Sequence, residues 1–170
     1  VYISFTPYAT AGYQPIEEVV DHGYAMAVFC YEDVTRDNGD FADGLAAFFP
    51  RQGADAPGKI SLWAYAAMRV MDYLQTLPEI DSARTFVMGH SRLGKTALWA
   101  AAQDERFAAA VSNDSGCSGA AVSRGKVGES VAAIYRQFPF WFCENYGAYG
   151  GREDALPFEQ YQLLACIAPR

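Results

Sequence analysis

The chain has 170 residues, and 51% of them are hydrophobic, which is enough to bury one sizeable core. Its 13 Lys and Arg residues against 20 Asp and Glu residues leave a formal net charge of −7. This charge works against a surface that follows nucleic-acid phosphates or docks on anionic lipid. No apolar run approaches the roughly 18 residues of a membrane-spanning helix. We therefore expect a single domain with neither nucleic acid nor a membrane as its partner.

The first sixty residues begin with a predicted strand, helix and strand. Residues 1–6 alternate and are rich in β-forming side chains, residues 15–21 carry helix formers, and residues 25–31 form an apolar run. Residues 32–59 are rich in Asp, Gly and Pro, which is typical of a long loop excursion. Such excursions often carry binding residues.

Strands and helices continue to alternate after this excursion. Residues 60–77 repeat apolar side chains at helical spacing, residues 85–88 form a short apolar run, and another strand is predicted at 108–112. A helix is expected directly after Ser91, and residues 163–168 fit either a helix end or a strand. The alternation predicts an α/β fold, in which a mostly parallel sheet carries helices on both faces as a three-layer sandwich.

One octapeptide between a predicted strand and helix, Gly89-His-Ser-Arg-Leu-Gly-Lys-Thr96, satisfies two different motifs. As G-x-x-x-x-G-K-[ST] it is a phosphate-binding loop, in which backbone N–H groups and Lys95 hold phosphates and Thr96 binds magnesium. Asp114, at the end of the next predicted strand, would then be the magnesium-binding carboxylate. This match is short and leaves the rest of the chain unexplained.

The same octapeptide also fits a nucleophile elbow, the sharp strand-to-helix turn that exposes a catalytic serine hydroxyl. Ser91 would be the nucleophile, and the following backbone N–H would face the developing oxyanion. Gly89 and Gly94 would let strand and helix approach closely. The usual motif has glycine two residues after the serine, where this chain has Leu93. Spacing alone therefore does not decide between the two motifs.

Five ordered segments of the chain carry a family resemblance. They are residues 89–99, Asn113-Asp-Ser-Gly-Cys-Ser-Gly-Ala-Ala121, Gly128-Glu129, Phe138-Pro-Phe-Trp-Phe-Cys143 and residues 156–170. In the same order, they resemble segments of the glucuronoyl esterases, carbohydrate esterase family 15, and look most like its bacterial members. The resemblance spans nearly the whole chain. It implies an α/β-hydrolase fold and favours the nucleophile elbow over the phosphate-binding loop.

The resemblance implies catalytic roles for three residues. Ser91 matches the serine that attacks the ester carbonyl, and Arg92 matches the arginine that helps to stabilise the tetrahedral oxyanion. A fixed guanidinium supplies positive charge where negative charge develops. Asp114 stands where the family often has a catalytic glutamate, although some members carry the acid on a later loop. Asp114 is therefore the catalytic acid, a residue that only helps to orient the catalytic histidine, a redundant second carboxylate, or a turn residue at the end of the strand.

A serine hydroxyl needs a neighbouring imidazole as its base, but the chain has only His22 and His90. We expect His22 to cap the first helix, and His90, next to Ser91, to turn away from the hydroxyl. The resemblance places the catalytic histidine after Arg170. We therefore expect residues 1–170 to be one domain that is incomplete at its C-terminus and at its N-terminus.

The resemblance also implies contacts with the substrate. Lys95, Glu129 and Gln137 match residues that bind the hydroxyls of a uronate. Without the resemblance, they would be interpreted as an exposed helix lysine, a cap and a surface polar residue. Trp141 and its aromatic neighbours are expected to line the core or the cleft wall rather than to stack on the sugar.

We expect no metal and no cofactor. The four cysteines lack C-x-x-C spacing, and two histidines are too few to favour a structural zinc site. Cys30 and Cys166 lie in apolar runs, whereas Cys117 and Cys143 lie in loop-like segments and could pair if the compartment is oxidising.

The resemblance predicts a serine esterase that cleaves (4-O-methyl-)glucuronoyl esters joining glucuronoxylan to lignin, through an acyl-enzyme and without a cofactor. A role on lignocellulose implies a secreted or periplasmic protein. Three alternatives remain open at this stage. They are another carbohydrate esterase, such as an acetyl xylan esterase, a nucleotide-binding P-loop protein, and an inactive carbohydrate-binding relative.

Overall fold

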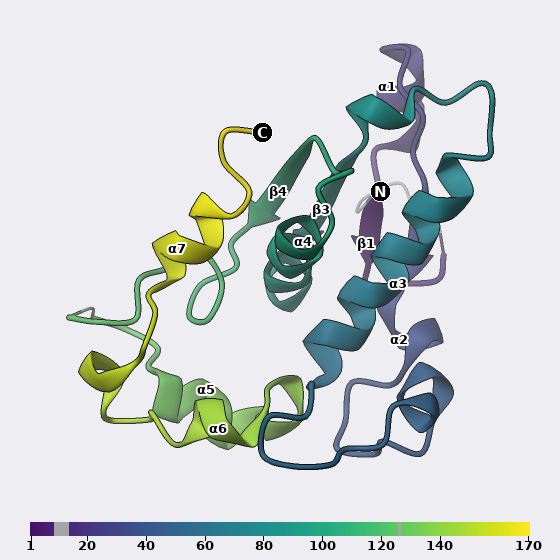
Figure 1. Cartoon of the computed structure of the whole chain (residues 1–170). Coiled ribbons are helices and arrows are strands. Elements are labelled where there is room, and N and C mark those ends of the chain that lie inside the picture. Colours follow the sequence, from purple (N-terminus) through teal and green to yellow (C-terminus); the bar gives the residue numbers. More distant parts are fainter. Residues whose placement is uncertain (9–13, 126) are drawn as a thin grey trace.

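The computed structural model describes residues 1–8, 14–125 and 127–170. At the centre of this part of the chain lies a parallel sheet with strand order β2-β1-β3-β4, of which Figure 1 labels β1, β3 and β4. Its strands are β1 (Tyr2–Ser4), β2 (Val28–Cys30), β3 (Phe86–His90) and β4 (Ala109–Asn113). Because parallel strands all point the same way, the residues that follow them gather at one edge of the sheet. The predicted parallel sheet is confirmed.

In the described residues, the connections between the strands contain α1 (Ile16–Asp21), α3 (Lys59–Leu74) and α4 (Arg92–Gln103), along with a short helix in the excursion. Helix α4 packs along β3 and β4, and α3 packs against α4 (Figure 1). Both helices bury alanines completely, and small side chains allow close helix packing.

Helix α3 ends at Leu74, three residues earlier than the sequence predicts. The N–H of Thr76 bonds to the carbonyl of Tyr73, and the N–H of Leu77 bonds to that of Leu74, so the chain leaves the helix through tighter turns. Pro78 disfavours helical backbone in the residue before it, which explains the early exit.

The excursion and the second half of the chain contain short elements. The excursion holds α2 (Tyr31–Val34) and a 3₁₀ turn at Gly44–Phe48, and the second half holds α5 (Val131–Gln137), a 3₁₀ turn at Pro139–Trp141, α6 (Glu144–Gly147) and α7 (Gln160–Ala165). Figure 1 shows these later elements as an open arc from β4, and α7 returns to pack against α4. A capping box between Glu159 and Gln162 starts α7, so a helix and not a strand leads into residues 163–168.

The two faces of the sheet differ along β3. Val87 and Gly89 are buried on the face toward α4, whereas Phe86 and Met88 point to the other face and are 49% and 37% exposed. Met88 pairs in register with Val111, which is 45% exposed. An apolar row therefore crosses β3 and β4 on the face opposite α4. Among the described residues, no helix is long and apolar enough to span a membrane.

Candidate active site

Ser91 lies at the sharp turn between β3 and α4. Its φ of 55° and ψ of −122° fall in a region that residues with a Cβ rarely adopt. Such backbone strain persists where the surrounding structure enforces it, and it is common at functional sites. The structure thus forms the strand–turn–helix arrangement that a nucleophile elbow requires.

Gly89 explains how the strand and the helix approach each other at this turn. A Cβ at Gly89 would lie 2.3 Å from the carbonyl oxygen of Leu93, a distance that no side chain tolerates. Gly94 is nearly as crowded, because a Cβ there would lie 3.0 Å from the carbonyl oxygen of Asn113. Leu93 stands where the usual motif has glycine, and its side chain is fully buried in the core.

The contacts of two side chains, Thr96 and Lys95, do not favour the phosphate-binding interpretation of the octapeptide. The Thr96 hydroxyl is fully buried and donates a hydrogen bond of 3.0 Å to the carbonyl of Arg92. The Lys95 ammonium is buried and donates to the carbonyl of Ser115. The hydroxyl and the ammonium that a magnesium nucleotide needs are therefore both engaged inside the protein.

Backbone donors also gather beside Ser91. The Ser91 N–H donates to the carbonyl of Asn113 over 2.9 Å, which ties the elbow to the end of β4. Arg92 is the first residue of α4, and the first N–H groups of a helix have no acceptor within the helix. The Arg92 N–H is thus suited to receive negative charge that develops near Ser91.

The Arg92 side chain is held rather than solvated. It is 27% exposed, and its Nη1 donates to Oδ2 of Asp37 in an ion pair. Its guanidinium carbon lies 4.8 Å from the ring centre of Trp141, 5.5 Å from that of Phe138 and 5.7 Å from that of Phe5. Arg92 Nε is buried and has no acceptor among the described residues, so the guanidinium keeps unused hydrogen-bonding capacity.

Asp37 is the site residue that sequence reasoning missed. Its side chain is only 5% exposed. Besides Arg92, it accepts hydrogen bonds from Trp141 Nε1 over 2.6 Å and from the Tyr31 hydroxyl over 3.1 Å. Burial and the Asp37 carboxylate raise the pKa of Tyr31, which keeps this hydroxyl protonated as a donor. The expectation that residues 32–59 carry binding residues was the one signal that pointed toward it.

A buried lysine organises the segment that carries Asp37. Lys59 is fully buried, and its ammonium donates to Thr35 Oγ1 over 2.5 Å, to the Asp40 carbonyl over 2.5 Å and to Asp43 Oδ1 over 3.1 Å. Burial alone would raise the pKa of Asp43. The Arg36 N–H, Lys59 and Thr35 outweigh this effect, and the pKa of Asp43 is lowered.

Both histidines are engaged away from the Ser91 hydroxyl. His22 ends α1, and its Nδ1 lies 2.7 Å from the Glu18 carbonyl oxygen, so the predicted capping role is confirmed. The His90 ring packs edge-on against Phe5, and its Nδ1 lies 3.1 Å from Nδ2 of Asn113.

The structure brings some of the predicted site residues together and leaves others apart. Ser91, Arg92, Lys95 and Asp114 all lie near the carboxyl ends of β3 and β4. Asp114 is exposed and has a φ of 47°, so the chain turns sharply there. The Lys95 ammonium faces Ser115 inside the protein, and its proposed contact with a uronate remains a prediction.

Glu129 and Gln137 lie farther along the chain, and both side chains are exposed. Neither makes a hydrogen bond to another described residue. Gln137 ends α5 and directly precedes Phe138, whose ring lies near Arg92. No hydrogen bond or ion pair among the described residues joins Glu129 to the elbow. Trp141 is buried and stacks on Phe138 at 3.8 Å, which confirms its predicted place in the core or cleft wall.

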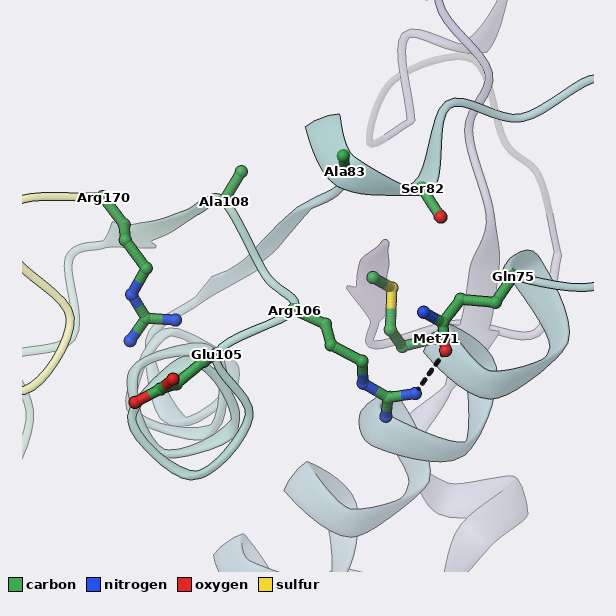
Figure 2. A pocket seen from close by; sticks show the side chains of 8 residues that line it. All are labelled: Met71, Gln75, Ser82, Ala83, Glu105, Arg106, Ala108 and Arg170. Carbon is green, nitrogen blue, oxygen red and sulfur yellow. Dashed lines mark hydrogen bonds between the residues drawn. The ribbon is translucent and has the colours of Figure 1, made fainter.

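A cavity of about 530 Å³ lies away from this site. Figure 2 shows its lining, in which Arg106 donates a hydrogen bond of 2.6 Å to Gln75. Ser82 and Ala108 line it just before β3 and β4, at the edge of the sheet opposite to Ser91.

All four cysteines are free thiols. Within the described ranges, no three His, Cys, Asp or Glu side chains are grouped as metal ligands.

The chain resembles known esterases over most of its length. The family model "Glucuronyl esterase, fungi" matches residues 7–170. The chain is 42% identical over 165 residues to "Carbohydrate esterase MZ0003" of an unknown prokaryotic organism, covering 94% of this chain and 38% of that protein.

Solved structures give the same picture. A CE15 glucuronoyl esterase from Teredinibacter turnerae superposes with a TM-score of 0.88 at 30% identity, covering 99% of this chain and 46% of that one. A glucuronoyl esterase from Sporotrichum thermophile, solved with methyl 4-O-methyl-β-D-glucopyranuronate, superposes with a TM-score of 0.67 at 27% identity. That match covers 84% of this chain and 42% of the fungal one. The chain thus spans less than half the length of these relatives.

Proposed function

The chain belongs to the glucuronoyl esterase family, and from this premise we propose that it hydrolyses esters of (4-O-methyl-)glucuronic acid with Ser91 as nucleophile. One observation carries the proposal. Ser91 stands at a strained turn between β3 and α4, and the guanidinium of the next residue, Arg92, is held in place by Asp37. A relative solved with a methyl glucuronate ester supports the substrate class.

The proposed reaction proceeds through an acyl-enzyme. Ser91 Oγ attacks the ester carbonyl and gives its proton to the histidine that the family resemblance places after Arg170. The Arg92 N–H and guanidinium stabilise the tetrahedral oxyanion, and the histidinium gives its proton to the ester oxygen as the C–O bond breaks, so that the neutral alcohol leaves and the acyl-enzyme forms. Water, deprotonated by the same histidine, then attacks the acyl carbonyl, and the proton returns to Ser91 Oγ as glucuronate is released. Asp114 is the proposed acid that orients the histidine, and no cofactor takes part.

The natural substrate proposed is the ester that joins glucuronoxylan to lignin alcohols, which implies secretion or a periplasmic location. Lys95, Glu129 and Gln137 are the proposed contacts with the uronate. A site whose polar groups are arranged for sugar hydroxyls penalises an analogue that leaves them unpaired, by up to ~10⁴-fold.

This substrate class is tested on a chain extended after Arg170 to include the histidine. We expect higher kcat/KM on benzyl glucuronate than on 4-nitrophenyl acetate or acetylated xylan, and complete loss with Ser91→Ala. Gln137→Ala should lower kcat/KM on the uronate ester far more than on the acetate. If acetylated xylan is hydrolysed faster than benzyl glucuronate, the proposal is wrong and the protein is a carbohydrate deacetylase. Mg-ATP binding that is lost with Lys95→Ala would contradict the esterase.

A further inference from the structure

We propose that Asp37 is the positioning residue for Arg92, and that its carboxylate fixes the direction in which the guanidinium presents its N–H groups beside Ser91. This inference rests on the proposed function, because it concerns the arginine that stabilises the oxyanion. It adds a residue 55 positions away in sequence to the machinery of the elbow.

The contact between the two side chains is made through one nitrogen. Nη1 of Arg92 donates to Oδ2 of Asp37, while the buried Nε has no acceptor among the described residues. A bidentate pair would consume two donors of the guanidinium. The contact through one nitrogen anchors Arg92 and leaves other donors for charge that develops on the substrate.

The aromatic rings around Arg92 cannot set this direction alone. Phe5, Phe138 and Trp141 surround the guanidinium carbon at 4.8 to 5.7 Å. Attraction between a cation and a ring face depends on distance far more than on where each N–H points. A hydrogen bond, in contrast, weakens steeply when its angle departs from linearity. The Asp37 carboxylate is therefore the contact that defines the orientation of Arg92.

Asp37 is itself held firmly enough to perform this role. The Trp141 indole N–H binds Oδ1, the Tyr31 hydroxyl binds Oδ2, and the side chain is 5% exposed. A buried carboxylate without such donors and a cationic partner would be strongly destabilising. Lys59 fixes the flanking segment by binding Thr35 on one side of Asp37 and Asp43 on the other. Asp37 thus has little freedom to follow Arg92 if the arginine moves.

This arrangement predicts an effect on the chemical step. An oxyanion exists in the transition state and not in the bound ester, so misdirecting its donor lowers kcat and leaves KM nearly unchanged. A residue that only supports the fold would instead lower the amount of active protein or change both constants.

The first test uses Asp37→Asn in the extended chain with benzyl glucuronate. The amide keeps the shape of the side chain and loses the charge. We expect kcat to fall by about tenfold or more, with KM within about threefold of the parent value. Asp33→Asn is the matched control, because it removes an exposed carboxylate from α2 in the same excursion and should leave kcat unchanged. Asp37→Glu should retain more activity than Asp37→Asn.

The decisive measurement is a double-mutant cycle with Arg92→Ala. If Asp37 acts through Arg92, Asp37→Asn should cost less than about twofold once Arg92 is already alanine. The inference is wrong if Asp37→Asn matches the parent enzyme, or if it costs the same factor with and without Arg92. If Asp37→Asn does not fold, Tyr31→Phe removes one hydrogen bond to the carboxylate. It should lower kcat by about threefold with Arg92 present and not in its absence.

Failure of the proposed function gives a different result from failure of this inference. A parent enzyme that does not cleave the uronate ester contradicts the proposed function. The same cycle is then run on 4-nitrophenyl acetate, since hydrolysis of any ester passes through an oxyanion. Coupling between Asp37 and Arg92 on that substrate supports the inference, and additivity overturns it.

Discussion

The geometry around Ser91 depends on the absence of a side chain two residues earlier. A Cβ at Gly89 would lie 2.3 Å from the backbone oxygen of Leu93, so Gly89→Ala must push α4 away from β3. We expect the free energy of unfolding to fall by about 2 kcal/mol, the usual range for overpacking. We also expect kcat to fall, because the elbow shifts. Gly39→Ala, where a Cβ meets nothing within 4 Å, is the control for both measurements.

Pairing with Asp37 also affects the charge that Arg92 presents to the product. The proposed hydrolysis would release a carboxylate near a guanidinium that is paired with the Asp37 carboxylate. Asp37→Asn removes this negative charge, so glucuronate should inhibit the variant several-fold more strongly than the parent at neutral pH. The measurement is the competitive inhibition constant of glucuronate, with uncharged glucuronamide as the control ligand. Equal inhibition of parent and variant would show that Asp37 does not compensate the charge of the Arg92 guanidinium.

At the scale of single residues, the sequence predicted the site residues that are close to one another along the chain. The octapeptide and the strand–helix alternation placed Ser91 at a strand-to-helix turn that fits two motifs, and the family resemblance favoured the nucleophile elbow and gave Arg92 its role. Asp37 could not be assigned, because a pairing across 55 residues leaves no periodicity or spacing. Burial of Lys95 was missed for the same reason, since its partner Ser115 lies in a loop after the next strand.

At the scale of elements, the long excursion is stabilised by an ion pair between the buried Lys59 and the partly buried Asp43. The pKa of Asp43 in the folded protein is lowered from its ordinary value of 3.8. The unfolded chain therefore takes up a proton at higher pH than the folded one. The resulting stability is fully present above about pH 4 and is lost as pH falls through the lower folded pKa.

Asp43→Asn should remove the part of the pH dependence of the unfolding free energy that comes from the Asp43 carboxylate. We expect the difference in unfolding free energy between pH 5 and about pH 3 to be smaller in the variant than in the parent. Urea denaturation at each pH measures it, with Asp33→Asn as the exposed control. The interpretation of Lys59 as the organiser of the excursion is wrong if parent and variant lose stability in parallel.

Elements with strong apolar periodicity were predicted well, and those set by tertiary contacts were not. Helix α4 and strand β4 lie within two residues of their predicted bounds. Strand β2 is shorter than the predicted run over residues 25–31 at both ends, and at its carboxyl end Tyr31 begins α2. There its ring packs 4.9 Å from Trp63 and its hydroxyl binds Asp37. Helices α5 and α6 lie in a Gly- and aromatic-rich segment that gives no clear period.

For the whole molecule, the α/β-hydrolase fold implied by the family resemblance is confirmed by the parallel sheet and by the solved relatives. Residues 1–170 on their own should hydrolyse uronate esters at no more than a trace rate, because His22 and His90 are both bound elsewhere. Extension to the histidine expected after Arg170 should restore turnover. Equal activity of the two chains, abolished by His90→Ala, would contradict this expectation.

The burial of lysine side chains has a practical consequence for covalent attachment. The sequence contains three lysines, of which Lys59 and Lys95 are buried and Lys126 lies outside the described residues. Amine-reactive supports and labels need an exposed, deprotonated amine, so both buried lysines are shielded while the protein stays folded. A lysine-directed reagent should therefore leave Lys59 in the excursion and Lys95 after the elbow unmodified in the folded protein. If Lys59 or Lys95 becomes reactive under heat or denaturant, that reaction shows that the structure around the site has opened.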